Sequence, residues 1–252
     1  MSFAAIFQAL ALPPETLVEQ RVPKTLLVEN GAPTASDKRQ INDGIEGCLW
    51  HAALKPATVG IPAFRDATRE YLEIAVVTVQ LRTSAKPGRL VELIHRAIPY
   101  PVLLATRQGV AVSLSVAHKR WSELETGKVV LEELRATVPF RPEAPTKSEA
   151  GFLVRLRLAG LPRRDLFALY HGWLEAVLAL EAAQISGAFV PPVSADQALV
   201  MREALASHAA SQRELAMLRA QAERETQINR RVDLNLAIKR LETRIAELAA
   251  GL

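Results

Sequence analysis

The sequence predicts an α+β protein, with a mixed α/β domain around a central sheet followed by an all-helical region. Two apolar, β-branched runs flank Arg107-Gln108-Gly109, which is typical of a hairpin with a short glycine-containing loop. The run Tyr71–Arg82 is apolar on both faces through its middle, as expected of a central strand that is covered on both sides. Beyond residue 150 the apolar residues recur at helical spacing instead.

The N-terminal elements are predicted to be a short helix and an extended segment. Residues 2–11 read as a helix that ends at Pro13-Pro14. Thr16–Val28 has the composition of an edge strand, with a break at Pro23.

A longer helix is predicted to begin at Thr34 or Ser36. The prediction rests on apolar residues that would share one face of that helix, namely Ile41, Ile45, Cys48, Leu49 and Ala52. Gly44 and Gly47 weaken such a helix by about 1 kcal/mol each relative to alanine, so tertiary packing has to hold it.

The remaining elements of the first domain alternate between strand and helix. Thr58–Ile61 is predicted to be a small strand. Pro87 opens a helix that ends before Pro99 and whose inward residues are Leu90, Val91, Ile94 and Ala97. The hairpin follows, and Val129–Val138 is predicted to be the last strand.

The composition predicts a domain boundary near residue 140. Residues 1–140 form the mixed α/β domain, residues 141–150 form a proline-rich linker, and residues 151–252 form the helical region. Ser194 and Gln197 have the spacing of a capping box. The helix that they open is predicted to span residues 194–249, which is roughly 80 Å at 1.5 Å per residue.

The end of this helix has the spacing of a coiled coil. Residues four and three apart form the seam, which consists of Leu234, Ile238, Leu241, Ile245 and Leu248. Upstream, Leu215, Leu218, Ala222, Val232 and Leu236 follow a different register, so the clean pattern covers only about two heptads. Self-association through this helix is one alternative, and the other is that the helix folds back on residues 166–185 as an intramolecular hairpin.

Composition limits the class of protein. Of the 252 residues 49% are hydrophobic, which is enough for a packed core. Lysine and arginine exceed aspartate and glutamate by 31 to 27, a balance that permits contact with nucleic acid without demanding it. The single cysteine, Cys48, excludes an internal disulfide and fits a reducing cytoplasm. The longest apolar helix, residues 166–185, contains charged residues, so we expect no membrane span.

Four acidic residues suggest one enzymatic alternative. Asp43 and Glu46 lie three residues apart, and Glu70 and Glu73 precede the central strand. Paired carboxylates hold the divalent metal of many nucleases. The lysine that would be expected two residues after such an acid is missing, since Leu72 and Ala75 stand there. Solvated acids beside a buried strand are therefore the simpler interpretation, and no catalytic residue, metal or cofactor is assigned.

Other catalytic and metal-binding motifs are absent from the sequence. There is no glycine-rich phosphate loop, zinc-protease helix, cysteine pair or nucleophile elbow. The five histidines stand apart from one another and from acids at metal spacing; they are His51, His95, His118, His171 and His208. We expect structural roles for them.

A set of basic and aromatic residues suggests a nucleic-acid or partner surface. The basic residues lie at the ends of predicted strands and are Lys24, Lys55, Arg82, Lys119 and Arg120, and Tyr100 is an aromatic residue near them. Trp50 and Trp121 lie nearby in the predicted scheme. Basic groups beside an aromatic platform are what a groove for single-stranded nucleic acid uses.

The order of motifs resembles an uncharacterised bacterial family, a domain of unknown function, over the chain to about Gly187. Ile98-Pro99-Tyr100-Pro101-Val102 is the most distinctive of the matching segments. The others are Arg21–Lys24, Asp43–Trp50, Leu54–Thr58, Tyr71–Arg82, His118–Arg120 and Asp165–Tyr170. The resemblance implies a companion of helicase and DNA-methyltransferase genes in restriction-like defence islands, and it brings no catalytic residues.

These observations favour a non-enzymatic accessory subunit of a bacterial DNA-acting system. The helical tail would assemble the chain with itself or with a larger enzyme such as a helicase or methyltransferase, while the α/β domain contacts DNA, RNA or that partner. A metal-dependent nuclease and a coiled-coil structural scaffold are the alternatives.

Overall fold

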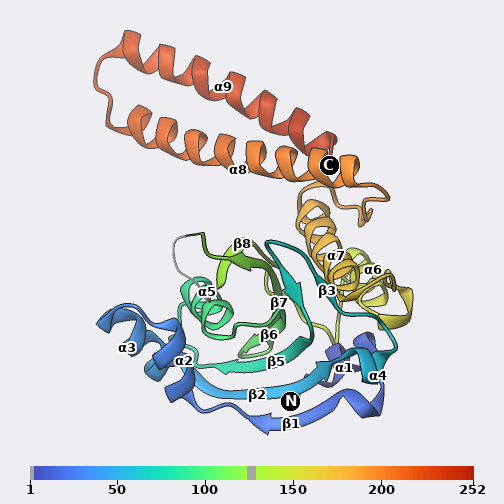
Figure 1. The fold of residues 1–252 in the computed structure, drawn as a ribbon. Helices are drawn as coiled ribbons and strands as arrows, with labels where there is room; N and C mark the ends of the chain where they lie inside the picture. Colours follow the sequence, from blue (N-terminus) through green and yellow to red (C-terminus); the bar gives the residue numbers. More distant parts are fainter. Residues whose placement is uncertain (1–2, 124–128) are drawn as a thin grey trace. The chain divides into compact units, whose positions relative to one another are not determined.

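The computed structural model describes residues 3–123 and 129–252 and confirms the α+β class. The chain divides into two compact units, Met1–Val177 and Leu178–Leu252. The first contains the sheet, and the second contains the long C-terminal helices (Figure 1).

A six-stranded mixed sheet forms the centre of the first unit (Figure 1). Its strand order is β1-β2-β5-β6-β7-β8, with β5 and β6 parallel and all other neighbours antiparallel. The six strands are β1 (Leu17–Arg21), β2 (Ile45–Leu54), β5 (Ile74–Leu81), β6 (Val102–Gln108), β7 (Ala111–Trp121) and β8 (Val129–Ala136). A separate two-stranded sheet pairs β3 (Phe64–Arg65) with β4 (Glu70–Tyr71).

The helices of the first unit cover the sheet. In Figure 1 the sheet curves around α5, whose apolar face packs on β5, β6 and Leu134 of β8. The helices before β6 are α1 (Ala4–Leu10), α2 (Lys24–Gly31), α3 (Ala35–Gly44), α4 (Pro56–Val59) and α5 (Pro87–Ala97). Pro23 directly precedes α2, and Pro87 is the first residue of α5. A proline at the start of a helix loses no hydrogen bond, because the first backbone N–H groups of a helix have no partner within it.

The central strand, the hairpin and the helix at Pro87 are confirmed. Six of the eight residues of β5 are consecutive and buried, and Leu90, Val91, Ile94 and Ala97 all face the core. In the hairpin, Gly109 has φ of 62°, a left-handed conformation that favours glycine. The parallel β5–β6 pair needs a crossover, which α5 supplies.

The helix predicted from Thr34 or Ser36 to Ala52 is wrong beyond Gly44, where the chain becomes strand β2. The pairing of β2 with β5 shifts register between Ile45 and Gly47 and again between Trp50 and Ala52. Each bulge inserts one residue and so breaks the two-residue alternation. The buried positions then fall at three- and four-residue intervals, which imitates a helix.

Two shorter predictions are also corrected. The extended segment Thr16–Val28 is a strand only up to Arg21, and after Pro23 the chain forms α2. The strand predicted at Thr58–Ile61 is not formed: Thr58 and Val59 are the end of α4, and Gly60 follows in the left-handed conformation. The backbone N–H of Lys55 donates to the hydroxyl of Thr58. This local bond favours a helical turn over an extended chain.

Residues 137–177 pack within the first unit. Phe140 pairs with Val112 of β7, and its ring meets Phe152 edge-on. Phe152 belongs to α6 (Lys147–Arg155), which begins at the capping box of Thr146 and Glu149. Trp173 of α7 (Leu166–Ser186) donates its indole N–H to the carbonyl of Leu156, which fixes α7 to the segment after α6. Of the predicted linker 141–150, residues 141–146 connect the Phe140 pairing to α6, and residues 147–150 already belong to α6.

Helix α7 is long and apolar enough to cross a membrane, the one such helix among residues 3–123 and 129–252. Of its apolar 18-residue window, 72% is buried inside the protein. We therefore assign α7 as a buried core helix.

The single helix predicted over residues 194–249 is wrong, because the chain turns at residues 225–227. It forms α8 (Ala195–Arg224) and α9 (Ile228–Ala250), which lie side by side as an antiparallel hairpin (Figure 1). Folding back lets α8 and α9 bury Leu215 and Leu241, which a straight helix would leave exposed.

Candidate functional site

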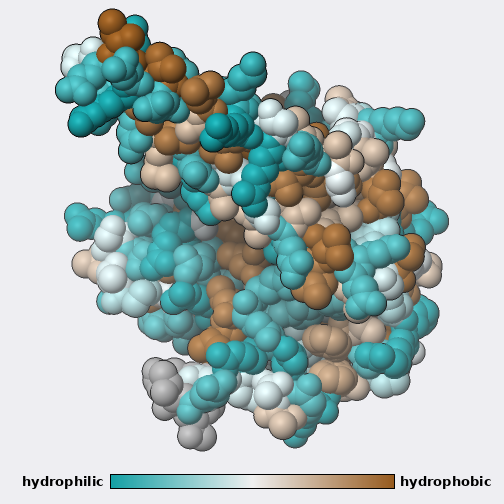
Figure 2. Space-filling model, turned by 90° about the horizontal axis from the view of Figure 1, so that it is seen from above, coloured by the Kyte–Doolittle hydropathy of each residue, from teal (hydrophilic) through white to brown (hydrophobic). Residues whose placement is uncertain are grey.

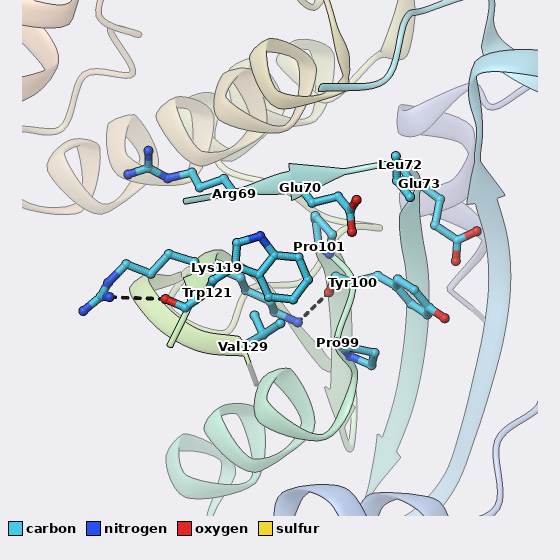
Figure 3. A pocket seen from close by; sticks show the side chains of 11 residues that line it. Arg69, Glu70, Leu72, Glu73, Pro99, Tyr100, Pro101, Lys119, Trp121 and Val129 are labelled. Atoms are coloured by element: carbon cyan, nitrogen blue, oxygen red, sulfur yellow. Dashed lines mark hydrogen bonds between the residues drawn. The ribbon is translucent and has the colours of Figure 1, made fainter. Parts of the chain in front are cut away.

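A pocket of about 210 Å³ lies at one end of the first unit's sheet (Figure 3). We name it the Tyr100 pocket. It brings together five residues that the sequence singled out for two different hypotheses, namely Glu70, Glu73, Tyr100, Lys119 and Arg120. Arg69, Pro99, Pro101 and Trp121 complete most of its wall.

Lys119 is a buried residue and not part of an exposed basic surface. It is 5% exposed, and its Nζ donates to the carbonyl oxygens of Ile98 and Tyr100 (Figure 3). Burial lowers the pKa of Lys119 to about 7. The Lys119 side chain, on β7, therefore fixes the segment that leads from α5 into β6. Pro99 and Pro101 stiffen the same segment.

Tyr100 separates two pockets. Tyr100 lines the Tyr100 pocket and is 46% exposed, and its ring points away from Trp121 (Figure 3). On the other side of Pro99 and Tyr100 lies a second pocket of about 230 Å³, which we name the Trp50 pocket. Its wall is mostly apolar and includes Trp50 and Leu26. Three aromatic side chains thus line neighbouring cavities.

The arginines and acids of the Tyr100 pocket are paired with residues outside its wall. Arg69 contacts Glu132 at 2.7 Å, and Arg120 contacts Glu123 at 2.9 Å. Glu70 is paired with Arg65, and Glu73 lies 3.4 Å from Lys55. The rim of the pocket therefore carries arginines whose present partners are exposed carboxylates, and an incoming anion can compete with these.

The four acids of the nuclease hypothesis do not gather in one place. Glu73 directly precedes Ile74, the first residue of β5, whereas Glu46 lies in the first bulge of β2, beside Leu81 at the other end of β5. Eight strand residues span about 23 Å at 3.3 Å per residue. Asp43 lies near Glu46, in α3. In the described part of the chain no group of three or more histidine, cysteine or acidic residues is arranged to hold a metal.

The remaining basic residues of the predicted surface lie outside both pockets. Lys24 begins α2 and donates to the carbonyl of Asn42 at 3.0 Å. Arg82 follows β5, and its backbone N–H donates to Gly44, at the end opposite to Glu73. Lys55 is joined to the Tyr100 pocket only through Glu73. The structure thus brings Tyr100 and Arg120 together and places Lys24 and Arg82 elsewhere.

Sequence reasoning missed a chain of polar side chains on the opposite face of β7. The hydroxyl of Tyr71 meets Nδ1 of His118, whose Nε2 lies 2.9 Å from Nδ1 of His171. Nε2 of His171 lies 3.5 Å from Glu175. Burial raises the pKa of Tyr71, so its hydroxyl keeps the proton. The four-residue spacing of His171 and Glu175 was the only sequence signal, because His118 arrives from another element.

The predicted coiled-coil seam is used within the chain. Leu241 is 8% exposed, and Leu234, Ile238, Ile245 and Leu248 are half-buried on the same side of α9. An ion pair between Arg219 of α8 and Glu242 of α9, at 2.7 Å, links the two helices.

The family of this chain follows from comparison with family models. A domain of unknown function, DUF4391, matches residues 10–245. The chain belongs to the DUF4391 family. The expected membership of an uncharacterised family is thereby confirmed. Comparison of this DUF4391 chain with curated proteins and with solved structures found no match.

Proposed function

We propose that this DUF4391 protein is a non-enzymatic accessory subunit of a bacterial, cytoplasmic DNA-acting system of the restriction or phage-defence kind. Its first unit binds nucleic acid at Tyr100. Its C-terminal helices assemble it with a second copy or with a larger subunit such as a helicase or methyltransferase.

The observation that carries this proposal is the shared wall of the two pockets. Tyr100 stands between a cavity lined by Trp50 and another lined by Trp121, with Arg69 and Arg120 beside the second. Aromatic rings next to arginine side chains suit a flexible single strand of nucleic acid. Every base has a face that can stack on a ring, and every phosphate has a charge that can pair with a guanidinium group. Lys119 supports this role indirectly, by holding the Tyr100 backbone in place.

The acids weigh against the nuclease alternative. A two-metal or one-metal phosphodiesterase needs its carboxylates within a few ångströms of each other. Glu70 and Glu73 are engaged by Arg65 and Lys55, and Asp43 and Glu46 lie at the far end of β5. The accessory role is consistent with this distribution.

The outer face of the helical hairpin supports assembly. Since the seam of α9 packs on α8, a partner would meet different residues. Apolar groups on the outside of the hairpin are exposed, among them Met217, Ile228, Val232 and Leu236, and Figure 2 shows apolar groups interspersed with hydrophilic ones there. Ile228, Val232 and Leu236 are spaced four apart and so share one face of α9.

Fluorescence anisotropy with a labelled oligothymidine tests the nucleic-acid arm. We expect binding that weakens with added salt, and Tyr100→Ala should reduce the affinity about tenfold, because stacking contributes about 1–3 kcal/mol per base. Tyr100→Phe keeps the ring and should stay within about twofold of the wild type. Absence of salt-dependent binding, or equal affinities of Tyr100→Ala and wild type, would refute this arm.

Affinity capture from the native cells, with and without nuclease, tests the assembly arm. A helicase or methyltransferase that remains bound after nuclease treatment is expected. Recovery that depends on intact nucleic acid would instead mean bridging through the first unit, and recovery of the protein alone would favour a scaffold.

A further inference from the structure

The geometry points to the Trp50 pocket as the site that takes one unpaired nucleobase of the bound strand, while the sugar-phosphate chain passes Tyr100 toward Arg69 and Arg120. This inference rests on the nucleic-acid function proposed above and adds which part of the ligand is recognised. It also specifies a single strand as the ligand and excludes a duplex.

The size of the pocket fits one aromatic ring system. Its volume is about 230 Å³. An apolar cavity of roughly 150 Å³ takes benzene, so this one accommodates a pyrimidine or purine but not a base pair. A base held in a duplex would have to leave its stack before it could enter.

The chemistry of the wall fits the face of a base. Trp50 and Tyr100 supply aromatic surface, and Leu26 and Ile98 supply aliphatic surface. The indole N–H of Trp50 already donates to the carbonyl of Ala52 at 2.9 Å. What this side chain offers a ligand is therefore its ring, which stacks on any base without selecting one.

One polar side chain of the wall can address the edge of the base. The Nδ2 atom of Asn30 donates to the carbonyl of Leu26 within α2 at 2.9 Å, and this leaves Oδ1 to accept from the ligand. An amide oxygen accepts from the exocyclic amino group of adenine or cytosine or from a ring N–H of thymine or guanine. We therefore expect weak preference among bases.

The two pockets are close enough to serve neighbouring parts of one strand. Pro99 and Tyr100 line both of them, and the ammonium group of Lys119 holds this dividing segment through the carbonyls of Ile98 and Tyr100. A base on one side of Tyr100 and a phosphate on the other belong to the same short stretch of strand.

The test compares three ligands of equal length by anisotropy with the full-length protein: oligothymidine, its duplex with oligoadenosine, and a fully abasic strand with the same phosphates. We expect the duplex and the abasic strand to bind at least about tenfold more weakly than oligothymidine. Equal binding of the abasic strand would overturn the base-pocket inference but leave nucleic-acid binding standing. Failure of all three ligands to bind would refute the proposed function itself.

Two variants of equal charge change localise the effect. Leu26→Asp alters a pocket residue that is 48% exposed, and Val138→Asp alters a residue that is 53% exposed and lines neither pocket. Both positions are exposed, so both variants should fold. We expect Leu26→Asp to weaken oligothymidine binding about tenfold and to leave abasic-strand binding at the level of Val138→Asp. Indistinguishable oligothymidine affinities of the two variants would contradict the assignment.

Discussion

At the scale of single residues, Lys119 explains why the segment Ile98–Pro101 is fixed. A lysine ammonium group has three donors, and two of them go to carbonyl oxygens that no helix or strand satisfies. Burial of a charge is unfavourable, which is why the pKa of Lys119 falls from 10.5 to about 7. The residue thus holds a loop at the cost of some stability at neutral pH.

This cost gives a measurable pH dependence. Between pH 7 and about 10.5 the unfolded chain binds more protons at this lysine than the folded one, so the free energy of unfolding rises with pH. From pH 7 to pH 8.5 the gain should be about 1–2 kcal/mol in the wild type and absent at this position in Lys119→Met. Urea unfolding of both proteins at the two pH values measures it. Parallel changes in the two proteins would show that Lys119 is protonated throughout.

The contact between Tyr71 and His118 provides a hydrogen-bond partner for a buried hydroxyl group. Tyr71 is fully buried, and a buried hydroxyl without a partner costs about 1–3 kcal/mol. Nδ1 of His118 accepts from the hydroxyl of Tyr71, and Nε2 of His118 can then donate to Nδ1 of His171, whose Nε2 lies 3.5 Å from Glu175. The buried hydroxyl of Tyr71 thus has a hydrogen-bond partner, which is in turn bonded to the partly exposed His171.

At the scale of elements, the packing of α2 on α5 depends on the absence of a side chain. A Cβ atom at Gly31 would lie 2.5 Å from the carbonyl oxygen of Leu93 and 2.7 Å from the Cβ of Ala97. Neither backbone can yield without moving its helix. The two helices approach closely because this position is glycine.

Gly31→Ala should therefore destabilise the first unit by about 1–3 kcal/mol. Gly88→Ala, in α5, is the matched control, since a Cβ there meets nothing within 4 Å. The control should be neutral or stabilising by up to about 1 kcal/mol, because alanine favours the helix. Thermal unfolding of the two variants decides it, and similar melting temperatures would count against close α2–α5 packing.

The elements also show where sequence patterns suffice. β5, α5 and the β6–β7 hairpin were predictable because each is regular and its period matches its structure. β2 was not, since two bulges convert its period into one that resembles a helix. The turn at residues 225–227 has no proline or glycine, and the apolar spacing of Ala222 and Val232 continues across it, so no pattern in the sequence marks it.

The candidate site was predictable in part. The predicted strands place Tyr100 and Arg120 near one another, and in the structure both line the Tyr100 pocket, because strand ends converge at one edge of a sheet. Lys119 was predicted to lie on a basic surface because of its charge, yet it is buried. The alternation of residues along β7 does not indicate that its ammonium group bonds to two backbone carbonyl oxygens. Arg69 and the pairing of His118 with His171 depend on contacts between distant segments, which no local pattern encodes.

At the scale of the whole molecule, the division after Val177 separates the two proposed roles. The pockets at Tyr100 belong entirely to the first unit, and the hairpin of α8 and α9 belongs to the second. Deletion of α8 and α9 should therefore abolish assembly and leave nucleic-acid binding by the first unit measurable.

A chain that ends at Gly187 tests this separation. It keeps all residues that line the two pockets and lacks α8 and α9, so oligothymidine binding should stay within about twofold of the full chain while self-association is lost. Light scattering coupled to gel filtration, at several protein concentrations, gives the mass of both forms. A full chain that is monomeric at every concentration, or a shortened chain that associates equally, would contradict assembly through the helices.

The single cysteine has a consequence for any such complex. Cys48 lies in β2, is 4% exposed, and burial raises its pKa to about 12. The sulfur is therefore a thiol and not a thiolate at neutral pH, and oxidants and other sulfhydryls cannot reach it. We therefore expect no disulfide between copies of the folded protein, and its assembly should be the same under oxidising and reducing conditions.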